Sequence, residues 1–456
     1  MESLENIVSL AKRRGFIYPS SEIYGGFSAV YDYGPYGVEL ATNIKNHWWK
    51  EMVQLTDNIV GLDSAIFMSP KIWEASGHVT GFADPMVEHK ETNTRYRVDE
   101  LLEGAGVPLG QSETPDDLAA LFEENFEKLD LPSKQRMDFS EVKSFNLLVK
   151  SNLGNTTDDL SDPVYLRGET CQGIYVNYKN ILNTNRVKIP FGVAQIGKAF
   201  RNEVTTKQWI FRTREFEQME MQYFVTPKIE MEQFELWKER RLQYYINLGI
   251  KLENLRLKPH ENLAFYAKAA EDIEYNFPMG FKELEGIHAR GNYDLTQHQN
   301  ASGVDLSYID PETNERFLPH IVETSTGVGR NFLMHLTESL VEEKTEQGER
   351  TVLKLPFVLA PVKVAVFPLM KNKPELVAKA KSIYEDLRKV YMSEWDDNGN
   401  VGKRYRRQDE IGTPFCVTID YDSLEDGTVT VRHRDTMTQE RVGSDKLLTY
   451  LNHHLQ

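Results

Sequence analysis

Two stretches of the sequence, VAQIGKAFRNE at residues 193–203 and FRTREFEQMEMQ at residues 211–222, decide the fold. Both alternate residue types with a period of two, and a polar interruption separates them, which predicts two antiparallel strands joined by a long loop. In the second stretch the even positions from Arg212 to Gln222 are polar except for Phe216. Such a face is either a solvated surface crossed by salt bridges or the floor of a binding site.

The residue types on this face suit a ligand with an anionic and a cationic group. Arg201 and Glu203 project together from the first strand, because strand side chains alternate. A guanidinium on a rigid strand can hold a phosphate or carboxylate through two hydrogen bonds, and Phe216 offers a flat surface to a base. The combination suits ATP, with Arg201 the best-placed group to neutralise an α-phosphate when an acyl group attacks it.

Two further stretches place glycine and charged residues before an apolar helix. The first, ETSTGVGR at residues 323–330, precedes an expected helix over 331–340, where glycines and N–H groups allow a phosphate to approach and Arg330 would reach its γ end. The second, LRGETCQG at residues 166–173, precedes an expected helix over 174–182. Glycines before a helix are also ordinary turn residues, and Thr170 could simply cap the second helix.

The chain before these strands predicts a helix, a strand and an insertion. Apolar residues at helical spacing over 38–52 are followed by an apolar run over 59–67 that we expect to end as a strand at Pro70. Between residues 77 and 162 the composition shifts toward charged and turn-forming residues, which indicates an insertion in a catalytic body. Within it, the periodicity over 116–129 predicts a helix.

The chain after these strands predicts a separate domain. Helical periodicity returns over 229–248, and a proline-bounded connector lies near residues 355–361. Beyond it, an expected strand over 362–367, a helix over 374–391 and two strands, 415–419 and 428–431, alternate. This order indicates an α/β domain of about 100 residues.

Composition limits the class of protein. With 456 residues and 40% hydrophobic content, two or three domains are expected, and neither a secretion signal nor a membrane span is predicted. Two distant cysteines, Cys171 and Cys416, predict no disulfide framework and a cytoplasmic protein. The net charge of -16 argues against non-specific coating of nucleic acid, so any contact would use local basic patches.

Several motifs are absent from the sequence. It has no Walker or Rossmann fingerprint, so ATP would not bind on a P-loop. It has no Cys-x-x-Cys, and the histidines, among them His288, His298 and His335, lack His-x-x-x-His spacing. We therefore predict no structural metal and no zinc, and expect these histidines in the core or at the surface.

Taken in order, the helix and strand before Pro70, the RNE and FRTREF segments and the GVGR segment resemble motifs 1, 2 and 3 of the class II aminoacyl-tRNA synthetases. Within that class the chain resembles the dimeric glycyl-tRNA synthetases over nearly its whole length. The stretches that carry this resemblance are RGF (14–16), YDYGP (31–35), RYR (95–97), FEQME (216–220) and KELEG (282–286).

The resemblance implies an α+β fold. An antiparallel-sheet catalytic domain would span residues 1–75 and 163–355, with an insertion over 76–162 and an α/β anticodon-binding domain over 356–456. In that domain, four cations surround a tyrosine and would contact phosphates and stack an anticodon base, unless they form a solvated basic turn. These residues are Lys403, Arg404, Tyr405, Arg406 and Arg407.

The resemblance also implies site residues, with Arg201 and Arg330 as the catalytic pair. The expected ATP contacts are Arg201, Asn202, Glu203, Phe211, Arg212, Thr213, Arg214, Glu215, Phe216, Glu283, Leu284, Gly327, Val328, Gly329 and Arg330. The expected glycine contacts are Arg97, Glu169, Phe216, Glu217, Gln218, Met219, Glu220, Glu323, Thr324, Ser325, Thr326 and Gly327. Because glycine has no side chain to hold, its pocket must grip the ammonium with carboxylates and fill the space of a larger side chain. Gly168, Cys171 and Gly329 stand where many relatives have Pro, Ala and an acidic residue.

The implied activity is that of a glycine–tRNA ligase. It would use ATP and Mg²⁺ to form glycyl-adenylate and then transfer glycine to the 3′ end of tRNA(Gly), as a homodimer with no membrane or DNA partner. Two alternatives are a class II synthetase for another small amino acid, such as threonine or proline, and a tRNA-binding relative without catalysis. The acidic pocket residues disfavour proline, and retention of Arg201, Glu203, Arg212 and Arg330 disfavours loss of catalysis.

Overall fold

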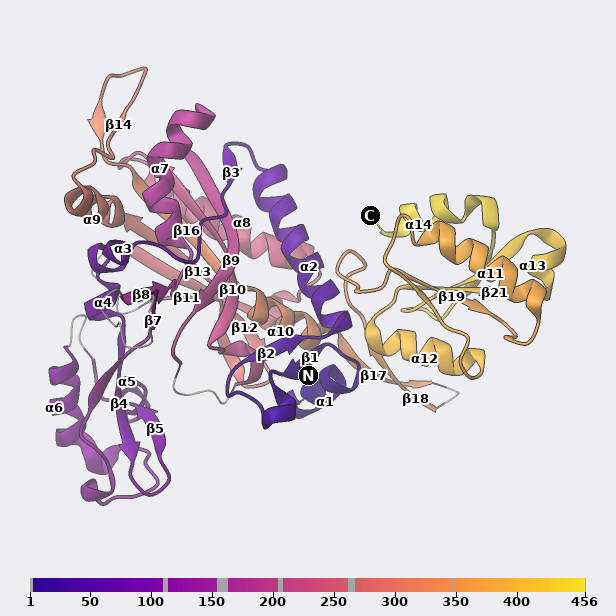
Figure 1. The fold of residues 1–456 in the computed structure, drawn as a ribbon, viewed down its shortest axis with the longest axis horizontal. Helices are drawn as coiled ribbons and strands as arrows, with labels where there is room; N and C mark the ends of the chain where they lie inside the picture. Colours follow the sequence, from indigo (N-terminus) through magenta and orange to yellow (C-terminus); the bar gives the residue numbers. More distant parts are fainter. Residues whose placement is uncertain are drawn as a thin grey trace.

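The computed structural model describes residues 3–109, 114–153, 163–203, 208–260, 267–345 and 348–455. Figure 1 shows a central body, a smaller domain formed by the inserted segment at one end and the C-terminal domain at the other. The α+β class predicted from the sequence is confirmed. No helix in the described part of the chain has the length and apolar character needed to cross a membrane.

A seven-stranded sheet forms the centre of the body. Its β9 (Phe191–Phe200) and β10 (Glu215–Val225) pair antiparallel, with Ala199 opposite Phe216, which confirms the predicted strand pair. The strand order is β11, β12, β13, β16, β10, β9, β3, and only β3 and β9 run parallel among these pairs. The other strands are β3 (Ile59–Gly61), β11 (Leu255–Pro259), β12 (Ala269–Phe277), β13 (Gly280–Gly291) and β16 (His320–Gly327).

One face of this sheet is covered by long helices. The odd-numbered side chains Met219 and Met221 of β10 lie in an apolar cluster with these helices. The helices are α1 (Leu4–Arg13), α2 (Pro35–Trp49), α8 (Glu230–Asn247) and α10 (Val328–Ser339). This face therefore forms the core, in which apolar burial supplies most of the stabilisation.

The other face of the sheet is covered at one end. The helices α7 (Cys171–Asn185) and α9 (Tyr293–Ser302) enclose an apolar cluster that includes Phe224 of β10. Toward the start of β10, the even-numbered positions carry the polar side chains and Phe216 predicted from the sequence. The candidate site lies on this uncovered half, next to the N-terminus of α7.

The segment before Pro70 differs from the prediction. The strand β3 covers only Ile59–Gly61, and Pro70 begins helix α3 (Pro70–Ala75) rather than ending a strand. The prediction of a strand over 59–67 is wrong, because proline is also favoured in the first turn of a helix, where its missing N–H has no partner to lose. The predicted helix over 38–52 is confirmed, with α2 continuing as a π-helix over Lys50–Gln54.

The inserted segment folds around its own apolar cluster. A three-stranded sheet of β4 (Ala83–His89), β5 (Thr94–Arg97) and β6 (Lys143–Asn146) packs with α5 (Val98–Gly104) and α6 (Pro115–Asn125). The helix predicted over 116–129 is confirmed, although its α-helical part ends earlier. Shorter elements nearby are α4 (His78–Gly81), β7 (Val149–Asn152) and β8 (Pro163–Leu166).

The C-terminal segment forms the predicted α/β arrangement. In its five-stranded sheet, of order β20, β19, β21, β22, β23, the pairs that include β19 are parallel and the others antiparallel. The strands are β19 (Val364–Pro368), β20 (Ser393–Trp395), β21 (Phe415–Ile419), β22 (Thr428–His433) and β23 (Gln439–Gly443). The helices are α11 (Pro374–Leu387), α12 (Val401–Ile411), α13 (Tyr421–Asp426) and α14 (Leu447–Leu455).

Three further pairs of short strands complete the described structure. These are β1 (Ile17–Pro19) with β2 (Tyr31–Tyr33), β14 (Tyr308–Ile309) with β15 (Arg316–Phe317), and β17 (Leu340–Thr345) with β18 (Gly348–Leu353). Ion pairs from Arg13 and Arg14 to Glu410 connect α1 to the C-terminal domain.

Candidate functional site

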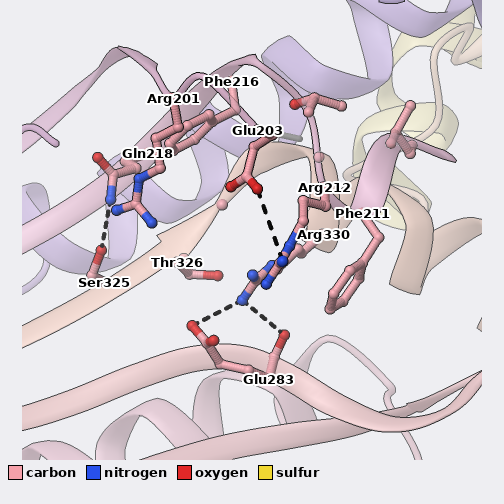
Figure 2. A pocket seen from close by; sticks show the side chains of 14 residues that line it. Arg201, Glu203, Phe211, Arg212, Phe216, Gln218, Glu283, Ser325, Thr326 and Arg330 are labelled. Carbon is pink, nitrogen blue, oxygen red and sulfur yellow. Dashed lines mark hydrogen bonds and ion pairs between the residues drawn. The ribbon is translucent and has the colours of Figure 1, made fainter. Parts of the chain in front are cut away.

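A polar pocket opens on the uncovered half of the central sheet, where the loop between β9 and β10 faces β13 and the start of α10 (Figure 2). Many of the expected ATP contacts meet here. The lining residues are Arg201, Glu203, Ile210, Phe211, Arg212, Thr213, Phe216, Gln218, Glu283, Ser325, Thr326, Gly327, Gly329 and Arg330.

One end of the pocket gathers positive charge. The Nη1 atom of Arg330 lies 2.8 Å from Oε1 of Glu283, and its guanidinium lies 4.6 Å from the centre of the Phe211 ring. Arg212, which lines the same pocket, approaches Glu203 at 3.8 Å, an ion pair that is marked by a dashed line in Figure 2. The nearby charge of Arg330 lowers the pKa of Glu283. Two guanidiniums held in this way suit a polyphosphate.

Arg201 is held over the middle of the pocket by two aromatic rings. Its guanidinium lies 5.1 Å from the ring centre of Phe82 and 5.5 Å from that of Phe216, and its Nε donates to the Gly168 carbonyl at 3.1 Å. Phe82 comes from the inserted segment, and no pattern in the sequence predicted its place here. A β-carbon at Gly168 would lie 3.1 Å from the Phe82 ring, so the glycine allows this close approach.

Beyond Gln218, Glu220 of the same strand and Glu323 of the neighbouring β16 place two carboxylates in a buried space. Glu220 accepts a hydrogen bond from Thr170, and Gln222 Nε2 donates to Glu323 Oε2 at 2.7 Å. Atoms of Cys171, Glu220 and Glu323 all lie within 4.8 Å of one another. Burial and the negative charge of Glu323 raise the pKa of Glu220, so this pocket favours an added cation.

Glu323 itself is held as a carboxylate by residues that the sequence analysis missed. Burial opposes its ionisation, yet Arg290 and His288 hold the pKa of Glu323 at about 2. Arg290 Nη1 lies 3.2 Å from Glu323 Oε2, and its Nε lies 2.9 Å from Asp294 Oδ2. Arg290 lies in β13 and Asp294 in the first turn of α9, so helical spacing in the sequence could not have identified the pair.

Glu169 lies at the edge of the same pocket. His78 of the inserted segment places its Nε2 3.0 Å from Oε1 of Glu169, and the Cys171 thiol donates to this oxygen at 2.9 Å. Although burial opposes it, the contact with His78 keeps the pKa of Glu169 well below its ordinary value. Arg97 lies apart from this cluster, with its Nη2 2.6 Å from Asp99 and 3.3 Å from Asp84, so its contact with glycine stays a prediction.

Some predicted side chains point away from the pocket. Glu217 pairs with Lys45 at 3.0 Å, and Met219 lies in the core. Thr324 is opposite Met221 in the sheet and faces that same core. Because the alternation along a strand sends neighbouring residues to opposite faces, these side chains face away from the pocket. A contact of these residues with glycine stays a prediction and would have to use their backbone atoms.

Thr326 lines the pocket, and its Oγ1 donates to the Leu284 carbonyl at 2.7 Å. Three other predicted residues direct their side chains elsewhere. Leu284 and Val328 belong to the core cluster. The Glu215 side chain pairs with Lys198. Contacts of these residues with a ligand would have to use their backbone atoms.

The basic stretch predicted to read the anticodon lies on α12. Arg404 is 2% exposed and donates to carbonyl groups within its own domain, so the prediction for this side chain is wrong because burial separates it from a partner. Tyr405 bonds Thr418, and Arg407 pairs with an aspartate of the same domain. For Lys403 and Arg406, a contact with tRNA stays a prediction.

Comparisons with known proteins agree with this geometry. A family model for the tRNA synthetase class II core domain (G, H, P, S and T) matches residues 153–339, and one for the anticodon binding domain matches residues 363–454. The Glycine--tRNA ligase of Treponema denticola is 51% identical over 98% of this chain and 96% of its own, and that of Chlorobaculum tepidum is 48% identical over 98% and 99%. That of Borreliella burgdorferi strain B31 is 51% identical over 99% and 97%. The resemblance seen in the motifs is thus confirmed, and the chain belongs to the glycine–tRNA ligase family of class II tRNA synthetases.

Proposed function

We propose that the chain activates glycine with ATP and transfers it to the 3′ end of tRNA(Gly). The observation that carries this proposal is the order of groups along one face of the sheet. Arg330 and Arg212 lie at one end of the row, Arg201 follows, and the buried carboxylates Glu220 and Glu323 lie at the other end. This order suits a reaction in which an amino acid attacks a nucleoside polyphosphate.

The first step is attack by the glycine carboxylate on the α-phosphorus of ATP. A C–O–P bond forms, the α–β phosphoanhydride bond breaks, and pyrophosphate leaves with the electron pair. Arg201 stabilises the charge that develops on the α-phosphate, while Arg212 and Arg330 hold the leaving pyrophosphate. The rings of Phe211 and Phe216 line the pocket and offer flat surfaces to adenine.

Magnesium enters this step with ATP, as part of the substrate. Glu203 and Glu283 are carboxylates that line the pocket, and oxygen ligands are what Mg²⁺ prefers. Glu283 pairs with Arg330 at 2.8 Å, whereas Glu203 lies 3.8 Å from Arg212, so Glu203 is the residue that we expect to hold the ion, directly or through water. When bound, Mg²⁺ neutralises phosphate charge.

The amino acid is selected by charge and by lack of space. The glycine ammonium binds near Glu220 and Glu169, where its charge opposes the effect of burial and of Glu323, which raise the pKa of Glu220. Cys171 is 1% exposed and lies between these carboxylates, where it occupies space that a larger amino acid would need. Steric overlap can reject an amino acid with an added methyl group more strongly than attraction to that methyl group could favour it.

The second step is attack by a terminal hydroxyl of tRNA on the adenylate carbonyl, which forms the ester and releases AMP. We assign tRNA recognition to the C-terminal α/β domain, and propose that the protein acts in the cytoplasm as a homodimer joined through the motif 1 segment. No side chain serves as a covalent nucleophile in either step.

The test is amino-acid-dependent exchange of labelled pyrophosphate into ATP without tRNA, across all twenty amino acids. We expect exchange with glycine alone, lost in Arg201→Ala and retained in Arg136→Ala, a matched arginine that pairs with Glu123 in the inserted segment. Exchange with another amino acid would mean that the chain is a class II synthetase for that amino acid. Absence of exchange in the wild-type protein would favour a tRNA-binding protein without catalysis.

A further inference from the structure

Three potential metal ligands from neighbouring strands converge beside the amino acid pocket. His260 follows the end of β11, Asp272 lies in β12 and His288 lies in β13. One ligand atom of each lies within 4.8 Å of the others. His260 Nε2 is 2.9 Å from Asp272 Oδ2, and the two imidazole rings meet at 84° with centres 5.8 Å apart.

The sheet register leaves room for this convergence. Gly286 lies opposite Asp272, and His288, two residues further along β13, shares its face. A β-carbon at Gly286 would lie 2.7 Å from Cε1 of His288, 3.5 Å from its Nε2 and 3.6 Å from Oδ1 of Asp272. The His288 ring therefore lies over the glycine and close to Asp272, and a side chain at residue 286 would occupy that space.

The second nitrogen of His288 is already engaged. Its Nδ1 lies 2.9 Å from Oε1 of Glu323, a residue kept ionised by Arg290. When a carboxylate lies next to one ring nitrogen of a histidine, it favours a proton on that nitrogen, and the other nitrogen keeps a free electron pair. Metal-bound histidines are commonly oriented by such a carboxylate. His288 is thus oriented as a ligand by a residue of the amino acid pocket.

We propose that His260, Asp272 and His288 bind a divalent first-row transition ion such as Zn²⁺. Two imidazoles and one carboxylate match the donors this ion prefers, whereas Mg²⁺ and Ca²⁺ prefer oxygen throughout. Ligands bound at about 2.0–2.2 Å lie roughly 3–4 Å from one another, so small side-chain movements complete the site.

The three ligands lie near the surface of the described structure. The side chains of His260, Asp272 and His288 are 33%, 13% and 23% exposed, although Nε2 of His260 is itself buried. The sequence analysis excluded zinc because it searched for closely spaced ligands. Here the ligands come from three strands, and only sheet pairing brings them together.

Metal binding also has a consequence that rests on the proposed function. An ion at Nε2 would hold the His288 ring in place, and with it the Glu323 carboxylate in the amino acid pocket. Protein freed of the ion with a chelator, and then assayed with Mg²⁺ but without the chelator, should therefore show a higher KM for glycine in the exchange reaction, with little effect on the KM for ATP.

The test uses the full-length protein, freed of metal, and titration with Co²⁺ in the absence of substrates. We expect one Co²⁺ per chain, with the visible absorption of a four-coordinate ion that Zn²⁺ then displaces. His260→Ala should weaken Co²⁺ binding by at least about 100-fold. A residue that only orients a metal ligand would cost about 10–100-fold. The matched control is His453→Ala, which removes an exposed histidine from α14.

Two results would overturn the proposal. One is Co²⁺ affinity in His260→Ala equal to that of wild type, and the other is weak binding that does not saturate at one ion per chain. If His260→Ala fails to fold, Asp272→Asn tests the same site with a change of nearly equal size. Because the titration needs no substrate, failure of glycine activation would leave its result intact, and the two proposals fail separately.

Discussion

Arg330 of α10 and Glu283 of β13 form an ion pair across the nucleotide pocket, 2.8 Å between Nη1 and Oε1, and the same Nη1 donates to the Glu283 carbonyl at 3.1 Å. The family resemblance led us to expect an acidic residue before this arginine, where this chain has Gly329. Glu283 supplies the missing carboxylate from another strand, since β13 pairs with β16, which leads directly into α10.

The first prediction follows from this pair. Arg330→Ala should lower kcat/KM for ATP in pyrophosphate exchange by about 10²–10³-fold, the loss typical of removing one preorganised donor to a transition state. Glu283→Gln should lower the same kcat/KM less, by about tenfold or about 1.4 kcal/mol, because Arg330 remains but is less well oriented. Arg316→Ala, which breaks an exposed pair with Asp305, is the control. An equal loss in Arg330→Ala and Arg316→Ala would rule out the assigned role.

The second prediction concerns pH and Glu220. Burial and Glu323 raise the pKa of this carboxyl, so the folded protein binds the proton more tightly than the unfolded chain does. The free energy of unfolding therefore falls as the pH rises from the ordinary pKa of a glutamate toward the raised pKa of Glu220. Glu220→Gln removes this loss, so the Tm difference between variant and wild type should increase from pH 5 to pH 8, by roughly 2–4 °C for each unit by which the pKa is raised.

Thermal unfolding of both proteins across this pH range checks that prediction. Glu217→Gln is the matched control, because Glu217 lies in the same strand on the opposite face and pairs with Lys45. The Glu220→Gln protein should also lose glycine-dependent exchange despite its higher Tm at pH 8. A Tm difference that shrinks as pH rises would show that Glu220 is charged in the free protein.

The third prediction concerns the buried ion pair behind the pocket. Arg241 Nε lies 2.6 Å from Glu285 Oε1, and Tyr245 donates to Oε2 of the same carboxylate at 2.6 Å. These charged side chains are only 4% and 1% exposed. Glu285→Ala would leave a guanidinium buried without its counterion and should lower the free energy of unfolding by about 3–5 kcal/mol.

Urea denaturation measures this loss, and the exposed pair of Lys198 and Glu215 provides the comparison. Their side chains are 50% and 38% exposed, so Glu215→Ala should cost about 0–1 kcal/mol. Similar urea midpoints for Glu285→Ala and Glu215→Ala would mean that the buried ion pair adds no more stability than the exposed pair does.

The period of two in residues 193–222 was enough to predict the central strands and their polar face, because alternation is a property of the backbone. The same rule identifies Glu217 and Met219 as core-facing. The expected glycine contacts nevertheless included both residues, since they were taken from a continuous family segment. Local geometry was therefore the better guide to side-chain direction in this strand.

Other parts of the site could not be predicted because they depend on distant pairing. His78 and Phe82 reach Glu169 and Arg201 from the inserted segment, and no local pattern encodes that approach. Arg404 was expected at a surface, yet it is buried within its domain, because a guanidinium surrounded by carbonyl groups can satisfy its donors there. Composition does not distinguish such an arginine from an exposed one.

The last prediction concerns Gly329, in the first turn of α10. A β-carbon at this position would lie 2.8 Å from the carbonyl oxygen of Ile210, next to the Phe211 ring on which Arg330 is stacked. Gly329→Ala must therefore separate the helix from this loop, and such overpacking costs about 1–3 kcal/mol. We expect at least a tenfold rise in the KM for ATP, about 1.4 kcal/mol, with the KM for glycine nearly unchanged.

Steady-state exchange at varied ATP tests this expectation against Gly104→Ala. Gly104 ends α5, and a β-carbon there would meet nothing within 4 Å, so this variant should keep the wild-type KM for ATP and gain up to about 1 kcal/mol of helix stability. The two variants add the same methyl group and differ in what it meets. A wild-type KM for ATP in Gly329→Ala would show that the position of Arg330 does not depend on close contact between α10 and Ile210.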